Sequence, residues 1–234
     1  MSTHPRTSFL DRVKNGLGLG QNKKLSPQRS GALQIHDLVK TGATFDSDPN
    51  ILFSEFLRGR HRSKPISSQG LYPEFFDTNP KTLDLLEALV RHINPEVVLE
   101  SGVANGASTR RILSALSQNL GSGKLISCDI DNRVATAELM ANPLFEFVHI
   151  SSKKDFSDVI ERLAKIDLFY HDSNHSYDHQ IFEYLAVWEK IPEGGILLSD
   201  DVNWSYAFLD FCAKVSRVPY VLSDTEKFSG FIQK

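Results

Sequence analysis

Short apolar runs alternate along the chain from residue 79 onward with longer segments whose apolar residues recur every three or four positions. The short runs predict buried strands, and the longer spacing predicts helices. Seven strands are predicted, at residues 97–100, 124–129, 145–150, 167–171, 196–199, 218–222 and 228–232. Six helices are predicted between them, one beginning at Asn79 and Pro80 and the others at residues 108–120, 133–140, 156–164, 177–190 and 204–214.

The order of these elements predicts the fold class. Strands that alternate with helices form a mainly parallel sheet with helices on both faces. The last two strands break the alternation, because only the polar residues 223–227 separate them. A parallel connection needs a dozen or more residues, so the last strand should be antiparallel. We therefore expect one α/β domain at residues 79–234, with a doubly wound, Rossmann-like, seven-stranded sheet.

The first 78 residues do not follow this alternation. Residues 1–35 carry one acid, Asp11, and six basic residues: Arg6, Arg12, Lys14, Lys23, Lys24 and Arg29. We interpret them as a basic, mobile tail; an amphipathic helix that binds a membrane or a partner, and an organelle transit peptide, remain alternatives. Residues 36–78 are expected to be a helical lead-in or lid, with a helix at 51–57 and a basic cluster at 58–64.

Composition narrows the classes of function. Of the 234 residues, 41% are hydrophobic and 24% are charged, which is typical of a globular protein rather than a disordered one. The only cysteines are Cys128 and Cys212, so a disulfide scaffold and a cysteine-rich metal site are excluded. The net charge of −3 argues against a nucleic-acid partner. No apolar run is long enough to span a membrane, and we expect a cytoplasmic protein.

Polar or acidic residues follow five of the predicted strands. Ligands bind at this edge of a parallel sheet, beyond the carboxyl ends of the strands. In the first of these segments Gly102 and Gly106 allow the backbone to approach a ligand closely, and a helix N-terminus that favours an anion follows. Glu100 in the same segment would attract a cationic amine. The five segments are 100–108, 129–131, 151–152, 172–175 and 200–201.

The first segment also carries a family resemblance. Its pattern Glu-x-Gly-x-x-x-Gly-x-Ser resembles the first motif of class I S-adenosylmethionine-dependent methyltransferases, and Asp129 is similar to their ribose-binding acid. The resemblance covers about residues 80–234 and implies S-adenosylmethionine as the cofactor. The cofactor-binding residues that it implies are Glu100, Gly102, Ala104, Gly106, Ser108, Asp129, Ser151, Ser152 and Asp172.

Two later segments, 168–177 and 194–202, resemble the metal-dependent small-molecule O-methyltransferases of the catechol and macrocin types. This resemblance implies a divalent cation, Mg²⁺ before others, held by Asp172, Asp200 and Asp201. It also implies that His175 is the general base, with Asp172 beside it. Oxygen ligands suit Mg²⁺, which can acidify a bound substrate hydroxyl. Asn174 departs from the second acid of the macrocin type, and His175 departs from the lysine of the catechol type.

Other interpretations of these residues remain open. Asp201 or Asn203 could cap the helix that begins near Trp204. His175 could be an ordinary turn residue. The spacing of His171, His175 and His179 imitates a helical zinc site, but the first histidine lies in a predicted strand, so the three cannot share a helix face.

The predicted function is methyl transfer from S-adenosylmethionine to a hydroxyl of a small molecule, such as a natural product, a phenol or a sugar. A nucleotide-dependent enzyme of another class and a non-catalytic cofactor-binding protein remain alternatives, because one fold supports many functions. The expected partner is the small-molecule acceptor, with no nucleic acid and no membrane span, and a homo-oligomer is left open. The sequence does not predict the identity of the acceptor.

Overall fold

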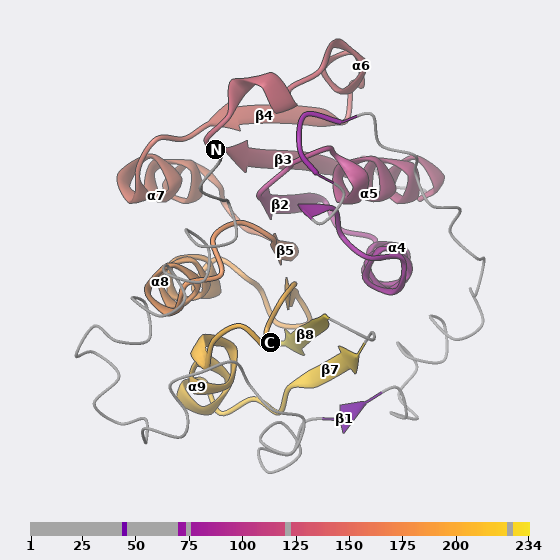
Figure 1. The fold of residues 1–234 in the computed structure, drawn as a ribbon. Coiled ribbons are helices and arrows are strands. Elements are labelled where there is room, and N and C mark those ends of the chain that lie inside the picture. Colours follow the sequence, from indigo (N-terminus) through magenta and orange to yellow (C-terminus); the bar gives the residue numbers. More distant parts are fainter. Residues whose placement is uncertain (1–43, 46–69, 74–75, 120–122, 224–226) are drawn as a thin grey trace.

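The computed structural model describes residues 44–45, 70–73, 76–119, 123–223 and 227–234 (Figure 1). The predictions of a mobile tail at 1–35, a helix at 51–57 and a basic cluster at 58–64 lie outside these residues. Among the described residues, no helix has the length and the apolar character that a membrane span requires.

One mixed sheet runs through the centre of the described structure (Figure 1). Its strand order is β1-β7-β8-β6-β5-β2-β3-β4. The strands are β1 (Thr44–Phe45), β2 (Val97–Ser101), β3 (Lys124–Asp129), β4 (Phe145–His149), β5 (Leu168–His171), β6 (Ile196–Ser199), β7 (Tyr220–Ser223) and β8 (Phe228–Gln233). Strands β2 to β6 are parallel, and β8 runs antiparallel between β6 and β7. The seven predicted strands of the α/β sheet and its antiparallel last strand are confirmed, and β1 adds an eighth strand at the edge.

Helices cover both faces of this sheet. In Figure 1, α4 (Pro80–Ile93) and α5 (Ala107–Gln118) lie on one side. Helices α7 (Lys153–Arg162), α8 (Tyr177–Trp188) and α9 (Ala207–Lys214) lie on the other. Each side has its own buried apolar cluster, and both clusters include residues of the central strands. The sheet therefore separates two hydrophobic cores, as expected of a doubly wound fold.

Local capping explains where several helices begin. The side chain of Asn79 accepts a hydrogen bond from the Thr82 amide at 3.0 Å, so α4 begins at Pro80 as predicted. Helix α7 begins three residues earlier than predicted, because Ser152 caps it through the Asp155 amide. The predicted helix 133–140 is divided into a 3₁₀ turn at Asn132–Val134 and α6 (Ala137–Met140). Thr136 separates them, with an extended backbone and a side chain that caps Leu139.

The predicted start of the last helix at Trp204 is wrong by three residues. Helix α9 begins at Ala207, whose amide donates to Ser205 Oγ at 3.1 Å. Neither Asp201 nor Asn203 is its N-cap, so the capping interpretation of these two residues is also wrong.

Two further features bear on the predictions. Strand β1 lies in the lead-in that was expected to be helical, and it pairs in parallel with the edge strand β7. The thiols of Cys128 and Cys212 are free and buried.

Candidate active site

The turn between β2 and α5 is packed against the residue that follows β5. Gly102 has a φ of +92°, and a Cβ atom there would lie 2.2 Å from the carbonyl oxygen of Asp172. Ala104 and Gly106 also have positive φ values, of 47° and 78°. Left-handed backbone at a non-glycine residue such as Ala104 costs energy and clusters at ligand-binding sites. The glycine turn, residues 102–106, is therefore fixed beside the segment that carries Asp172.

Asp129, at the end of β3, supports the glycine turn from its other side. Its Oδ2 accepts a hydrogen bond from the Val103 amide at 2.8 Å, and its Oδ1 accepts one from the Asp131 amide at 2.9 Å. Each carboxylate oxygen can accept more than one hydrogen bond, so capacity for ligand hydroxyls remains. Its predicted contact with the ribose stays a prediction that this geometry permits.

Glu100 lies beneath the glycine turn and is completely buried. Its two carboxylate oxygens accept hydrogen bonds from Ser108 at 2.6 Å, Thr109 at 2.7 Å and Ser127 at 2.6 Å. Burial raises the pKa of Glu100 to about 7, although the three hydroxyl groups partly oppose this. In the structure, Glu100 and Ser108 are therefore hydrogen-bonded to each other beneath the turn. Their predicted direct contact with the cofactor stays a prediction.

Ser151 and Ser152 lie at the same edge of the sheet, after β4. The pairing of Asp129 with His149 places them next to the end of β3. The Ser151 amide donates to Asp155 Oδ2 at 2.8 Å, and the Ser152 side chain caps α7. Both serines are exposed, so they remain accessible to a cofactor. Their predicted place near adenine is untested.

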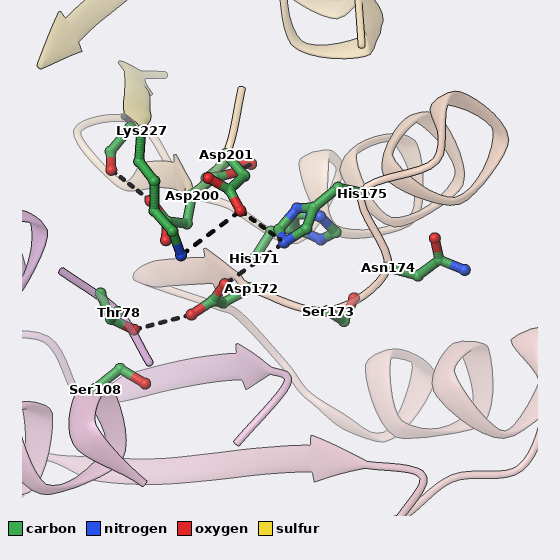
Figure 2. Close-up of polar contacts among 12 residues, drawn as sticks. Thr78, Ser108, His171, Asp172, Ser173, Asn174, His175, Asp200, Asp201 and Lys227 are labelled. Atoms are coloured by element: carbon green, nitrogen blue, oxygen red, sulfur yellow. Dashed lines mark hydrogen bonds and ion pairs between the residues drawn. The ribbon is translucent and has the colours of Figure 1, made fainter. Parts of the chain in front are cut away.

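Asp172, Asp200 and Asp201 form an acidic cluster at the ends of the neighbouring strands β5 and β6 (Figure 2). Asp200 and Asp201 are adjacent in sequence, and side chains of adjacent strand residues point to opposite faces. Strand β6 ends at Ser199, however, and Asp201 has a φ of +51°, so the chain leaves the strand here. Figure 2 shows that the two carboxylates lie near Asp172.

Hydroxyl groups from distant parts of the chain hold this acidic cluster. Asp172 Oδ2 accepts hydrogen bonds from Thr78 Oγ1 at 2.9 Å and from the Tyr170 hydroxyl at 3.1 Å. Asp200 Oδ1 accepts one from Ser229 Oγ at 2.6 Å. Thr78, Tyr170 and Ser229 were not predicted as site residues. Only the long-range folding of the chain brings Thr78 and Ser229 to this place.

Two nitrogen groups face the acidic cluster. His175 Nε2 lies 3.7 Å from Asp172 Oδ1 and 3.6 Å from Asp201 Oδ2. Lys227 Nζ lies 3.8 Å from Asp201 Oδ2 (Figure 2). The structure therefore brings the predicted residues His175, Asp172, Asp200 and Asp201 together. It adds Lys227, which sequence reasoning placed in a polar turn.

Burial controls the charges of these groups. Burial raises the pKa of Asp172 well above its usual range, and Asp200 raises it further. Burial likewise raises the pKa values of Asp200 and Asp201. Burial and the nearby His171 lower the pKa of His175 to about 3, which leaves its imidazole neutral near pH 7. Burial alone would lower the pKa of Lys227, but the surrounding aspartates raise it, so its ammonium group stays charged.

The fit of a divalent cation can be judged from the oxygens of the acidic cluster. Asp200 Oδ2 and Asp201 Oδ1 are buried and have no hydrogen-bond partner among the described residues, and such acceptors suit a cation. The same described residues nevertheless contain no group of three or more Asp, Glu, His and Cys side chains arranged to hold a metal ion. The ammonium group of Lys227 already faces Asp201. The donor chemistry suits Mg²⁺, but the arrangement does not fit it.

A second buried network explains the histidine spacing noted in the sequence. Glu183 on α8 is completely buried and lies 2.7 Å from His171 Nδ1 and 2.8 Å from His179 Nε2. Ser101 Oγ donates to it at 2.8 Å. Burial alone would raise the pKa of Glu183, but the bonds from the two histidines hold it below its usual range. His171 and His179 thus meet at a carboxylate that ties α8 to β2 and β5.

Comparison with known proteins gives the class of this fold. The O-methyltransferase from Bacillus cereus in complex with SAH is similar, with 16% identity, a TM-score of 0.56, and coverage of 68% of this chain and 83% of that one. SAH-bound methyltransferase PaMTH1 from Podospora anserina shares 12% identity, with a TM-score of 0.55 over 86% of this chain and 94% of that one. TomG, an O-methyltransferase from Streptomyces achromogenes involved in tomaymycin synthesis and solved with SAM, shares 14% identity, with a TM-score of 0.54 over 99% and 100%. At these identities the likeness establishes the fold.

Residues 99–202 match the family model described as a methyltransferase domain. This segment contains the glycine turn, Asp129, His175 and the acidic cluster. No curated protein matches the chain. The family match over residues 99–202 and the fold agree with the predicted class I S-adenosylmethionine-dependent methyltransferase.

Proposed function

We propose that this protein is a methyltransferase that moves the methyl group of S-adenosylmethionine to a hydroxyl oxygen of a small molecule. One observation carries the proposal: the close contact between Gly102 and the Asp172 backbone. This contact joins the turn that would hold S-adenosylmethionine to the segment that carries Asp172 and His175. A methyl donor and a set of groups able to accept a hydroxyl proton would therefore meet at one edge of the sheet. Four of the similar solved structures are described as O-methyltransferases, two of them as putative ones.

The reaction needs little covalent chemistry from the protein. The acceptor oxygen attacks the methyl carbon, the carbon–sulfur bond breaks with its electron pair left on sulfur, and the hydroxyl proton leaves. The protein contributes mainly by holding the two reactants in line. We assign the proton to the pair formed by His175 and Asp172, which lie 3.7 Å apart. The raised pKa of Asp172 makes its carboxylate the stronger base of the pair.

Assistance by a divalent cation, which the family resemblance implied, stays a prediction. The two buried carboxylate oxygens without a partner favour it. The arrangement of the described residues and the ammonium group of Lys227 beside Asp201 oppose it. The cytoplasmic location and the homo-oligomer also stay predictions.

Thermal unfolding with candidate cofactors tests the proposal. S-adenosylhomocysteine at 100 times its dissociation constant should stabilise the protein by about 2.7 kcal/mol, whereas NAD should have no effect. Stabilisation by NAD alone would favour an enzyme of another class. Turnover is then measured with a panel of catechols, other phenols and sugars. Binding of S-adenosylhomocysteine without turnover of any hydroxyl compound, together with methylation of amines or thiols, would contradict transfer to oxygen.

A variant of the His175–Asp172 pair, to which the proton is assigned, gives the mechanistic test. His175→Ala should lower kcat about 100-fold while the affinity for S-adenosylhomocysteine stays unchanged, because general base catalysis acts in the transition state. His149→Ala is the matched control, since His149 is an exposed histidine at the end of β4. Equal activity of the two variants would remove His175 from the mechanism.

A further inference from the structure

We propose that Lys227 takes the place of a divalent cation at the acidic cluster, so that the chain itself supplies the positive charge there. The consequence for methyl transfer rests on the proposed function. The placement of Lys227 does not, because it follows from the contacts of the described residues alone. The geometry points to a cluster that binds no divalent cation in the wild-type protein.

The position of the Lys227 side chain is the first support. Its Nζ faces Asp201 Oδ2 at 3.8 Å, and only 16% of the side chain is exposed. Figure 2 shows the ammonium group between Asp172 and the pair formed by Asp200 and Asp201. A lysine at this place occupies the space toward which the carboxylates of both strand ends point.

The backbone around Lys227 holds it over the acidic cluster. The Phe228 carbonyl accepts a hydrogen bond from the Val202 amide at 2.8 Å, and the Phe228 amide donates to Asn203 Oδ1 at 3.3 Å. These two bonds attach the residue after Lys227 to the residues just after Asp201. The backbone next to Lys227 is therefore anchored beside Asp201 through both polar groups of the Phe228 main chain.

Ser229 shows that the start of β8 is shaped to face these acids. Residues two apart in a strand lie on the same face, so Lys227 and Ser229 share a face of the chain. Ser229 Oγ donates to Asp200 Oδ1 at 2.6 Å, while Lys227 faces Asp201. Ser229 in β8 and Lys227, just before the strand, thus contact the two consecutive acids after β6.

Charge balance explains why the acidic cluster needs the ammonium group of Lys227 and why a divalent cation beside that group would be repelled. Buried carboxylates are strongly unfavourable unless a positive group and hydrogen bonds compensate them. The charged groups that act on Lys227 include Asp201, Asp200, Asp172 and Asp77. His175 is the neighbouring nitrogen group. A divalent cation beside the ammonium group would repel it strongly at such short range.

Binding of Mn²⁺, followed by electron paramagnetic resonance and calorimetry, tests the inference without any acceptor substrate. The wild-type protein should bind no Mn²⁺ at the acidic cluster, and EDTA should leave its melting temperature unchanged. Lys227→Met removes the ammonium group and leaves Asp200 Oδ2 and Asp201 Oδ1 available. This variant should gain Mn²⁺ binding at least about tenfold tighter than any binding by the wild type.

Matched variants separate this role from a merely structural one. Lys227→Arg keeps the positive charge and should bind no Mn²⁺. Lys227→Met combined with Asp201→Asn should lose the Mn²⁺ binding gained by the single variant. Lys214→Met is the control for removal of a lysine, because Lys214 is exposed on α9, and it should behave as the wild type does.

Two results would overturn the inference. The first is stoichiometric Mn²⁺ binding by the wild-type protein that the Asp201→Asn substitution abolishes. This result would decide the question even if the Lys227→Met variant does not fold. The other is a folded Lys227→Met variant that binds no Mn²⁺. Failure of the proposed function is distinguishable, since it would appear as absence of S-adenosylhomocysteine binding or of hydroxyl methylation. If methylation is found, its loss in EDTA would also count against Lys227 as the cation.

Discussion

Single residues at this site are constrained by what lies within a few ångströms of them. Gly102 and Gly194 both have strongly positive φ values, of 92° and 84°. A Cβ atom at Gly102 would overlap the Asp172 backbone, whereas one at Gly194 would meet nothing within 4 Å. The two positions therefore share the backbone constraint and differ only in the close contact. Substitutions at the two glycines can therefore distinguish the cost of backbone strain from the cost of steric overlap at the site.

Alanine substitutions at these glycines should have unequal effects. Gly194→Ala should lower the free energy of unfolding by about 1–2 kcal/mol, the usual cost of left-handed backbone. Gly102→Ala should lower it by roughly 2–5 kcal/mol, because steric overlap with a main chain is added, and it should abolish S-adenosylhomocysteine binding. Urea unfolding and calorimetry measure both quantities. Normal cofactor affinity in Gly102→Ala would contradict the placement of the cofactor at this turn.

Glu100 should make stability depend on pH. Its pKa is about 7 in the folded protein and 4.5 as the reference for the unfolded chain. The folded state therefore binds more protons between these values, and stability falls as pH rises from about 4.5 to 7. Since one pKa unit is worth about 1.4 kcal/mol, the full loss approaches about 3 kcal/mol. Glu100→Gln cannot titrate, so its unfolding free energy should fall less over this range; an identical pH profile would contradict the buried carboxylate.

Residue identities beyond the strand ends were harder to predict, for a physical reason. Asp172 and Asp200 follow apolar strands, and that local pattern made them visible in the sequence. Thr78 donates a hydrogen bond to Asp172, which lies 94 positions away in the sequence, and no local pattern predicts such a contact. One feature of the sequence could have pointed to Lys227 as a site residue: it directly precedes the last strand, which was expected to be antiparallel.

At the scale of elements, apolar runs located the strands, and side-chain capping decided the helix boundaries. Strand β3 matches its prediction residue for residue, because Gly123 precedes its apolar run and the acid Asp129 ends it. The start of α9 was missed because the left-handed Asp201 and the turn closed by Ser205 delay the helix. These choices depend on backbone angles, which residue types only partly determine.

Asp129 and Asp167 offer a matched test at the two ends of the sheet. Each carboxylate accepts hydrogen bonds from two backbone amides: Asp129 from Val103 and Asp131, and Asp167 from Glu96 and Val97. Alanine at either position should lower stability by roughly 1–3 kcal/mol. Only Asp129→Ala should also weaken S-adenosylhomocysteine binding, by about tenfold or more. Calorimetry that shows equal affinity in both variants would remove Asp129 from the cofactor site.

At the scale of the whole molecule, the sheet divides the apolar interior into two cores. Ile112 on α5 belongs to one core, and Ile160 on α7 belongs to the other. Both side chains are buried, yet a complete sheet layer separates them. Sheets and their covering layers pack about 10 Å apart, so the two residues share no direct contact.

Substitution of both isoleucines tests this division. Ile112→Val and Ile160→Val should each cost about 0.5–1.5 kcal/mol. Because the sites are distant, the double variant should lose the sum of the two values within about 0.5 kcal/mol. Urea unfolding of the four proteins gives the coupling energy. A coupling well above that value would mean that the sheet transmits packing changes from one core to the other.

The place of β8 inside the sheet has a consequence for synthesis of the protein. The ribosome adds this strand after β6 and β7, yet it lies between them and carries Ser229, with Lys227 just before it. At about 5–20 residues per second, roughly one to six seconds pass between the addition of Asp201 and that of Ser229. Until β8 pairs with both of these strands, they have no neighbour between them, and the acidic cluster lacks its contacts with Ser229 and Lys227. The acidic cluster is therefore completed only when the last strand inserts, so folding of the sheet and assembly of the site end in the same event.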